Sequence, residues 1–138
     1  MKSLLKKPML LCSLLLLTMS VPVMAQTKSF GFTLVLNQSV TGAAAVKAGG
    51  SSFEKKYYLR QTTITHPQNA TRYFSYHPSV NGRKVANGLS LSENDTKSHN
   101  NTYLSGEAKA GKTYKLYCKC TGNKRKDSKS TVSGRWTP

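Results

Sequence analysis

The chain has 138 residues, with 21 Lys and Arg against 5 Asp and Glu, and a formal net charge of +16 at neutral pH. Three cysteines are too few for a disulfide-dense scaffold. No stretch reaches the ~20 predominantly apolar residues of a membrane-spanning helix. We therefore expect one basic globular domain without a transmembrane segment in the mature chain.

The N-terminus has the order of a secretory signal peptide. Three lysines precede an apolar run over residues 9–17, and the small residue Ala25 follows. This order predicts cleavage after Ala25 and a secreted, extracellular protein. Residues 1–25 are then the signal peptide. Residues 26–138 form a single secreted domain that keeps 18 Lys and Arg against 5 Asp and Glu, a formal charge of +13.

Two segments before residue 66 have the residue pattern or the composition of β-strands. Phe30 to Asn37 alternates apolar and small or polar residues, which predicts a strand with one buried face. Tyr57 to Thr65 is dense in aromatic and β-branched residues, which also favours a strand. Between them, Asn37 to Ser52 is rich in Gly, Ala and Ser. Residues 49–52 are expected to form a mobile loop, and residues 43–48 could form one helical turn.

The middle of the chain carries turn signals. Thr71 to Tyr76 predicts another strand, and the pairs His66-Pro67 and His77-Pro78 are expected to end their strands because proline cannot donate to a sheet ladder. Asn-Gly pairs at 81–82 and 87–88 predict two tight hairpin turns. The polar segment 90–102 is expected to be an exposed loop.

The C-terminal part gives the clearest strand pattern. Residues 111–121 alternate strictly, with Tyr114, Leu116 and both mature cysteines on one face. Residues 130–136 place Val132 and Trp136 together on one side. Six to eight short strands and no helix predict an all-β fold, a small antiparallel β-sandwich or barrel.

Cys118 and Cys120 are the only cysteines of the mature chain. Two residues apart in a regular strand, their Cα atoms are expected about 6.6 Å apart, whereas a disulfide needs Cβ atoms about 3.8 Å apart. Three interpretations stay open: two free thiols in the core, a strained or intermolecular disulfide, and metal or redox chemistry. No histidine stands at ligand spacing to either cysteine, so we predict no metal site and no cofactor.

The histidines at positions 66, 77 and 99 permit a basic extracellular nuclease, because such enzymes need an acid, a base and cations around a phosphate. Glu54, Glu93, Glu107, Arg60 and Arg72 could complete such a site. Two of the three histidines precede proline, which explains them locally, and no catalytic motif is present. We therefore predict that the protein is not an enzyme and keep the nuclease as a third interpretation.

The strongest functional signal is a cationic stripe. It runs along the strand at 111–121 and into the loop behind it, and it includes an aromatic residue. A returning last strand would add a further arginine. The predicted anion-binding surface consists of Lys112, Lys115, Tyr117, Lys119, Lys124, Arg125, Lys126, Lys129 and Arg135. Such a surface fits phosphate-rich partners, although the same residues could form a merely solvated hairpin.

Three short stretches resemble a known group of proteins: Phe-Gly-Phe-Thr-Leu at 30–34, Tyr-Leu-Arg-Gln-Thr-Thr at 58–63, and Thr-Val-Ser-Gly-Arg-Trp at 131–136. They are similar to small secreted Firmicutes proteins that look like lactococcin-972-type bacteriocins. The resemblance implies a β-sandwich and bacteriocin-like action on the envelope of Gram-positive cells. Cysteines at 118 and 120 depart from that pattern, and the resemblance assigns no site residue.

The leading hypothesis is a secreted, cationic, non-enzymatic β domain that binds anionic cell-envelope polymers or membrane surfaces, with bacteriocin-like antibacterial action. An extracellular protein-binding or inhibitor module is the alternative, with the positive charge incidental. Because the protein is expected to leave the cell, nucleic acid is not a partner in the leading hypothesis.

Overall fold

The structure, a computed structural model, describes residues 24–138, so that residues 1–23 of the predicted signal peptide lie outside the described part. The all-β prediction is confirmed: the described residues contain nine strands, one 3-10 turn at Gly50–Ser52 and no α-helix. The strands are β1 Lys28–Leu34, β2 Ser39–Val46, β3 Lys56–Thr65, β4 Arg72–Val80, β5 Arg83–Lys84, β6 Leu89–Ser92, β7 Ser98–Thr102, β8 Thr113–Gly122 and β9 Ser130–Thr137.

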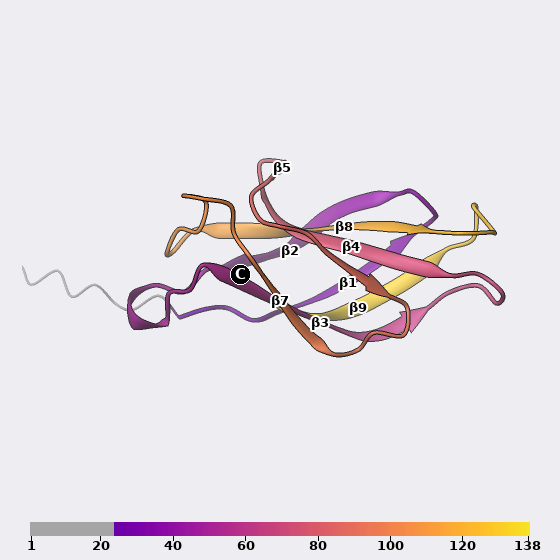
Figure 1. Ribbon diagram of the computed structural model, residues 1–138, viewed down its shortest axis with the longest axis horizontal. Helices are drawn as coiled ribbons and strands as arrows, with labels where there is room; N and C mark the ends of the chain where they lie inside the picture. Colours follow the sequence, from indigo (N-terminus) through magenta and orange to yellow (C-terminus); the bar gives the residue numbers. More distant parts are fainter. Residues whose placement is uncertain (1–23) are drawn as a thin grey trace, which may run out of the picture.

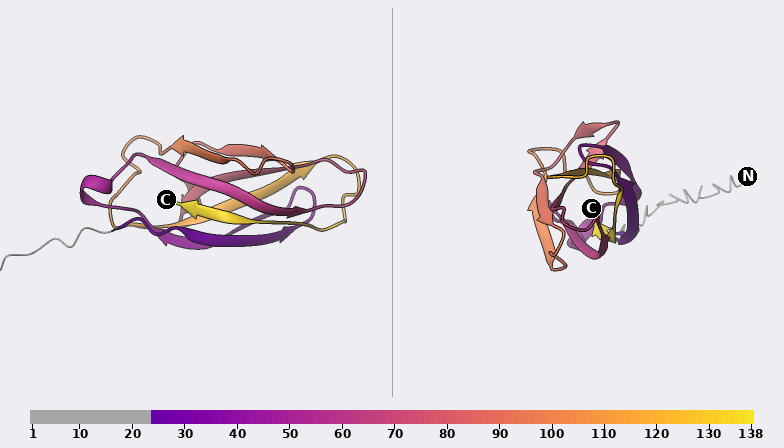
Figure 2. Two further views of the ribbon diagram at one scale, coloured as in Figure 1. Left: turned by 90° about the horizontal axis from the view of Figure 1, so that it is seen from below. Right: turned by 90° about the vertical axis from the view of Figure 1, so that its right-hand side faces the viewer.

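The strands form two antiparallel sheets. One has the order β1-β9-β3-β7, and the other has the order β2-β8-β4-β5, with β6 also paired to β4. In Figure 1, β8 and β4 lie above β9 and β3, and all four follow the long axis of the molecule. The end view of Figure 2 shows the two sheets enclosing the interior. Of the two predicted architectures, the structure has the sandwich.

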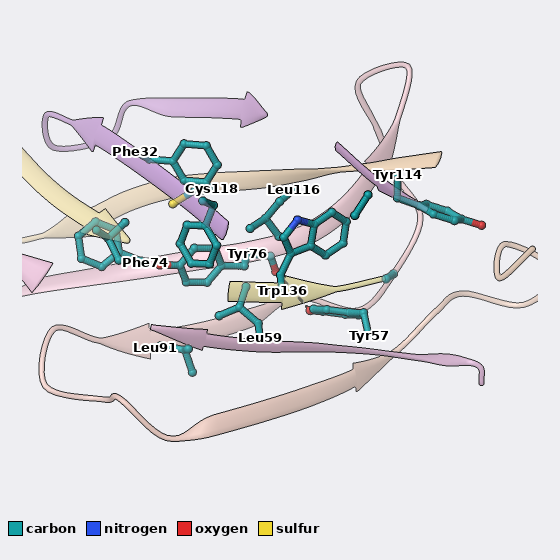
Figure 3. Packing of buried hydrophobic residues seen from close by; sticks show 14 of the residues in the cluster. Phe32, Tyr57, Leu59, Phe74, Tyr76, Leu91, Tyr114, Leu116, Cys118 and Trp136 are labelled. Atoms are coloured by element: carbon teal, nitrogen blue, oxygen red, sulfur yellow. Dashed lines mark hydrogen bonds between the residues drawn. The ribbon is translucent and has the colours of Figure 1, made fainter. Parts of the chain in front are cut away.

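The core lies between the sheets and is mostly aromatic. On β8, the residues at alternate positions from Tyr114 to Cys120 are all fully buried, as the alternation predicted. Figure 3 shows their side chains meeting those of β3, β4 and β9. The largest buried apolar side chains are Trp136, Tyr57, Tyr76, Tyr114, Phe74, Leu34, Leu59 and Leu116.

The helical turn considered at residues 43–48 is not formed, and a strand was missed: residues 39–46 form β2, which pairs with β8. Its small residues are a packing requirement: a Cβ on Gly42 would lie 3.2 Å from the ring of Phe32. A bulge follows, where Ala43 takes a φ of 46°. The Ala43 carbonyl there accepts a 2.8 Å hydrogen bond from the Trp136 indole, which ties β2 to the opposite sheet.

The predicted strand end at His77-Pro78 is also wrong, since β4 continues to Val80. The Pro78 carbonyl accepts a hydrogen bond from the Val85 amide at 3.2 Å. In a strand the N–H and C=O of one residue point to the same side. The side on which Pro78 lacks an N–H donor is therefore the edge of β4 where its partner is interrupted between β5 and β6. At the other pair, His66-Pro67, the prediction is confirmed, because β3 ends at Thr65.

Of the two Asn-Gly pairs, only the first forms the predicted turn. Asn81 and Gly82 have φ values of 50° and 76° between β4 and β5, as a two-residue hairpin requires. Residues 87–88 instead connect β5 to β6 along the same edge of β4. The segment 90–102 is not a loop: it contains most of β6 and all of β7, which extend the two sheets.

Candidate functional site

Strand β8 presents Lys115, Tyr117 and Lys119 on the outer face of the five-stranded sheet, opposite its core face. The two lysines stand four residues apart, which corresponds to ~13 Å along a strand. Tyr117 lies between them. We call the outward residues of β8, together with their outward neighbours on β4 and β5, the lysine face.

Strands β4 and β5 extend the lysine face. His77 is the register partner of Tyr117, and the two rings stack with centroids 4.3 Å apart and an interplanar angle of 12°. Lys84 on β5 is paired with Ser79, which in turn faces Lys115 on β8. Two strand spacings place the backbones of the two lysines ~9.5 Å apart. The face therefore holds three amines around a flat aromatic pair.

The imidazole of His77 is neutral at pH 7. Partial burial beside Tyr117 lowers its pKa below the usual value, while a contact of Nδ1 with the Pro78 carbonyl, at 3.1 Å, acts in the opposite direction. The positive charge of Lys84 lowers the pKa further. Acidification thus adds a charge to the lysine face.

The basic loop at 122–129 lies at one end of the long axis, where β8 leads into β9 (Figure 1). Its conformation is organised by Arg72, whose side chain is fully buried. The guanidinium donates to the carbonyls of Asn123, Lys124 and Arg125 at 2.7, 3.2 and 3.0 Å, and its Nε donates to the Ser130 hydroxyl at 3.0 Å. Backbone dipoles thus solvate a buried positive charge without a carboxylate partner.

This arrangement explains how the loop displays its cations. Lys124 and Arg125 have φ values of 53° and 48°, the left-handed region, and both send their carbonyls to the Arg72 guanidinium. Their side chains, with that of Lys126, are exposed. At Gly122, φ is 147° and a Cβ would lie 2.0 Å from the Thr71 carbonyl oxygen, so only glycine fits where the loop begins.

The structure separates the predicted stripe into three parts. Lys115, Tyr117 and Lys119 share the lysine face, and the loop cations with Lys129 lie beyond the end of β8. Lys112 lies just before β8, where its positive charge helps to lower the pKa of Glu107. Arg135 was placed wrongly: β9 pairs with β1 and β3 and not with β8, so Arg135 lies on the outer face of the other sheet.

Cys118 and Cys120 are free thiols in the core, so no disulfide joins them to each other. Burial raises the pKa of both thiols, and Cys118 is close enough to Tyr76 to affect its titration as well. A thiol held protonated is a poor nucleophile and a poor metal ligand. Among residues 24–138, no three His, Cys, Asp or Glu side chains form a group that could hold a metal ion.

Each histidine is engaged locally. His66 contacts the Pro67 carbonyl through Nδ1 at 3.1 Å, and His99 pairs with Asp95 at 2.8 Å. His77 belongs to the lysine face. The carboxylates that the nuclease interpretation used are also dispersed, since Glu107 pairs with Arg83 at 2.6 Å and Glu54 accepts from the Tyr58 hydroxyl at 2.5 Å.

Sequence reasoning missed two members of the lysine face, His77 and Lys84. The His-Pro pair was interpreted as a strand end, which removed His77 from the alternation of β4. Continuing that alternation through Pro78 would have placed Tyr73, Ser75 and His77 on one face.

No helix in residues 24–138 is long and apolar enough to cross a membrane. No protein-family model matches the sequence, and comparisons with curated proteins and with solved structures find no match.

Proposed function

We propose that this protein is secreted, is not an enzyme, and binds anionic polymers or membrane surfaces of bacterial envelopes through the lysine face and the basic loop. The observation that carries the proposal is the row of Lys115, Tyr117 and Lys119 on an open sheet face, with His77 and Lys84 beside it. The signal-like N-terminus and the resemblance to lactococcin-972-type proteins support the envelope as the location.

The spacing of the cations favours a repetitive partner over a compact one. The backbones of Lys115 and Lys119 lie ~13 Å apart along β8, which is more than the ~8 Å over which charges are screened at physiological ionic strength. Each amine therefore meets a separate negative group. A chain of phosphates or a layer of anionic head groups supplies negative groups at many positions, whereas a small ligand supplies one.

The test compares two variants that carry the same total charge. The first replaces five cations of the proposed surface with glutamine: Lys115, Lys119, Lys124, Arg125 and Lys126. The second replaces five exposed lysines elsewhere: Lys28, Lys55, Lys56, Lys97 and Lys109. We expect the first variant to lose adsorption to Gram-positive cell walls and to anionic vesicles, and the second to keep most of it.

Both variants should unfold at wild-type temperatures, because all ten positions point away from the core. Wild-type adsorption should weaken steeply between low and physiological salt. Equal adsorption by the two variants would contradict the proposal and favour a protein-binding or inhibitor module, with incidental charge. The antibacterial part of the proposal is tested separately, by growth inhibition of Gram-positive cells with purified protein and with the first variant.

A further inference from the structure

The outer face of the four-stranded sheet carries a pair of arginines with no counter-charge. Arg60 on β3 and Arg135 on β9 are direct register partners on neighbouring strands, and both are exposed. Within residues 24–138, neither forms a salt bridge. Like charges directly opposite each other in a sheet repel. An anion bound between the two arginines would therefore remove this repulsion.

A hollow of about 400 Å³ lies at this pair. Its lining combines the two arginines with hydroxyl groups, and it consists of Ser29, Phe30, Arg60, Thr62, Ser133, Gly134 and Arg135. Thr62 is the extra residue of a bulge, where the register between β3 and β9 shifts. The bulge turns Thr62 outward beside Thr63, and the Thr62 hydroxyl donates to the Ser133 carbonyl at 3.4 Å.

Two glycines add no side chain at the hollow: Gly134, which lines it, and Gly31, on the neighbouring strand β1. A Cβ on Gly134 would lie 2.1 Å from the Arg60 carbonyl oxygen and 2.8 Å from the Phe30 ring, so this position accepts no larger residue. Gly31, the register partner of Ser133, leaves open space, because a Cβ there would meet no atom within 4 Å. Side chains therefore surround the hollow without filling it.

One of the two guanidinium groups is held in position. Arg60 donates from Nε to the carbonyl of Thr96 at 2.9 Å. This bond fixes the guanidinium plane and leaves the two terminal nitrogens without a hydrogen bond to any residue of the described chain. Arg135 forms no side-chain hydrogen bond within residues 24–138. The terminal N–H groups of both arginines are thus available to one ligand.

We infer that this hollow binds a single tetrahedral oxyanion, a phosphate or sulfate group, between Arg60 and Arg135. Arginine presents a planar fork of N–H donors that matches two oxygens of such a group, and the charge of the anion removes the repulsion between the two guanidinium groups. The hydroxyls of Ser29 and Ser133 supply further donors at the rim. The site lies on the opposite face from the lysine face and does not depend on the function proposed for it.

The experiment is a titration of the full mature chain with sodium sulfate and with inorganic phosphate, followed by the NMR amide shifts of Ser133 and Gly134. Sodium chloride at matched ionic strength is the control. We expect saturable shifts with both oxyanions and none with chloride. R60Q and R135Q should each weaken binding about tenfold or more, the scale of losing one charge-assisted hydrogen-bonding partner. R135K should weaken binding as well, because lysine lacks the fork.

A variant with Lys115 and Lys119 replaced by glutamine should bind sulfate as the wild type does. Equal shifts with chloride, or equal weakening by the lysine-face variant, would overturn the inference. Two further probes identify the source of the phosphate: glycerol phosphate, and vesicles of phosphatidylglycerol. Competition of either probe with sulfate at Gly134 identifies it as a ligand of the hollow, and failure of both to compete restricts the site to the free ions.

Discussion

The two outer faces of this sandwich are both basic, yet they present different chemistry. The lysine face carries separated amines beside a stacked His77–Tyr117 pair, whereas the opposite face carries two adjacent arginines in a hollow with hydroxyl groups. A lysine amine is a mobile, strongly hydrated point charge, and an arginine is a directional fork. The formal charge of +13 on residues 26–138 therefore includes two different surfaces, one that we propose for an extended polyanion and one for a single oxyanion.

The largest effect is expected for a substitution in the core that unfolds the domain, because unfolding removes both binding faces at once. Trp136 is 1% exposed, and its indole donates to the Ala43 carbonyl of the opposite sheet at 2.8 Å. Trp136→Ala should lower the free energy of unfolding by ~3 to 5 kcal/mol. Urea denaturation followed by circular dichroism measures this loss. A stable Trp136→Ala protein that still binds through only one face would mean that the two sheets fold independently.

A smaller effect is expected for Arg72→Gln, which should act only at the basic-loop end of the lysine face. Loss of the guanidinium leaves the carbonyls of residues 123–125 without their buried donor, at a cost of ~2 to 4 kcal/mol. Amide hydrogen exchange should accelerate in the loop while sulfate binding at the arginine pair stays unchanged. The matched control is Arg83→Gln, because the exposed Arg83–Glu107 pair should contribute little to stability. Equal losses for both variants would contradict the role given to Arg72.

Lowering the pH should change binding at the lysine face by a moderate amount, which distinguishes this face from the arginine pair. The pKa of His77 lies below its usual 6.5 because of burial, so the residue becomes charged only as the pH falls well below neutral. One additional cation near an anionic membrane contributes ~1 kcal/mol, so adsorption to anionic vesicles should rise by at most about fivefold as the pH falls from 7 through the lowered pKa of His77. His77→Gln should remove this rise, and sulfate binding at the arginine pair should be insensitive to the substitution.

The lowered pKa of His77 also determines how the stability of the folded domain depends on pH. The unfolded chain takes up the proton at a higher pH than the folded domain, so His77 stabilises the folded state above pH 6.5 and loses that contribution as the pH falls through the lowered pKa. Comparing the pH dependence of unfolding in wild type and in His77→Gln measures this contribution. A larger stability of wild type at pH 5 than at pH 7, relative to the variant, would reverse the assignment.

The smallest effect is expected at a position that serves neither face. The Tyr103 hydroxyl is buried and has no hydrogen-bond partner in the described chain, although its ring packs on Tyr114 with centroids 5.0 Å apart. Tyr103→Phe should raise stability by up to about 1 kcal/mol, because an unpaired buried hydroxyl is removed. The control is Tyr76→Phe, which deletes a 2.7 Å bond to Gln61 and should cost ~1 to 2 kcal/mol. Thermal unfolding compares the two, and both variants should keep wild-type binding at each face.

The sequence was most informative in strands where apolar residues occupy every second position and are buried. The alternation on β8 predicted its buried face, and the same reasoning placed Val132 and Trp136 inside. It failed at β2, whose Gly and Ala residues have low β propensity, although Gly42 leaves room for the Phe32 ring. It failed again at β7, a polar edge strand that presents no apolar repeat. Packing against distant residues decided both cases, and local composition does not contain that information.

The candidate sites show the same division. Lys115 and Lys119 could be assigned to one outer face because alternation fixes side-chain direction within a strand. The position of Arg135 could not, because it depends on which strand β9 pairs with, and nothing in residues 130–136 specifies that partner. The arginine pair was therefore invisible in the sequence, although Arg60 and Arg135 were each noted separately.

The position of β9 has a consequence for how this chain must fold. Strand β9, residues 130–137, lies in the middle of its sheet, with β1 on one side and β3 on the other. During synthesis, β1 and β3 thus have no partner in common until β9 has been made. Pairings between the two ends of a chain are slow to form, so a truncation that removes β9 should abolish the four-stranded sheet altogether. The unit of folding therefore includes β9, and a fragment that lacks this strand is not expected to form both sheets.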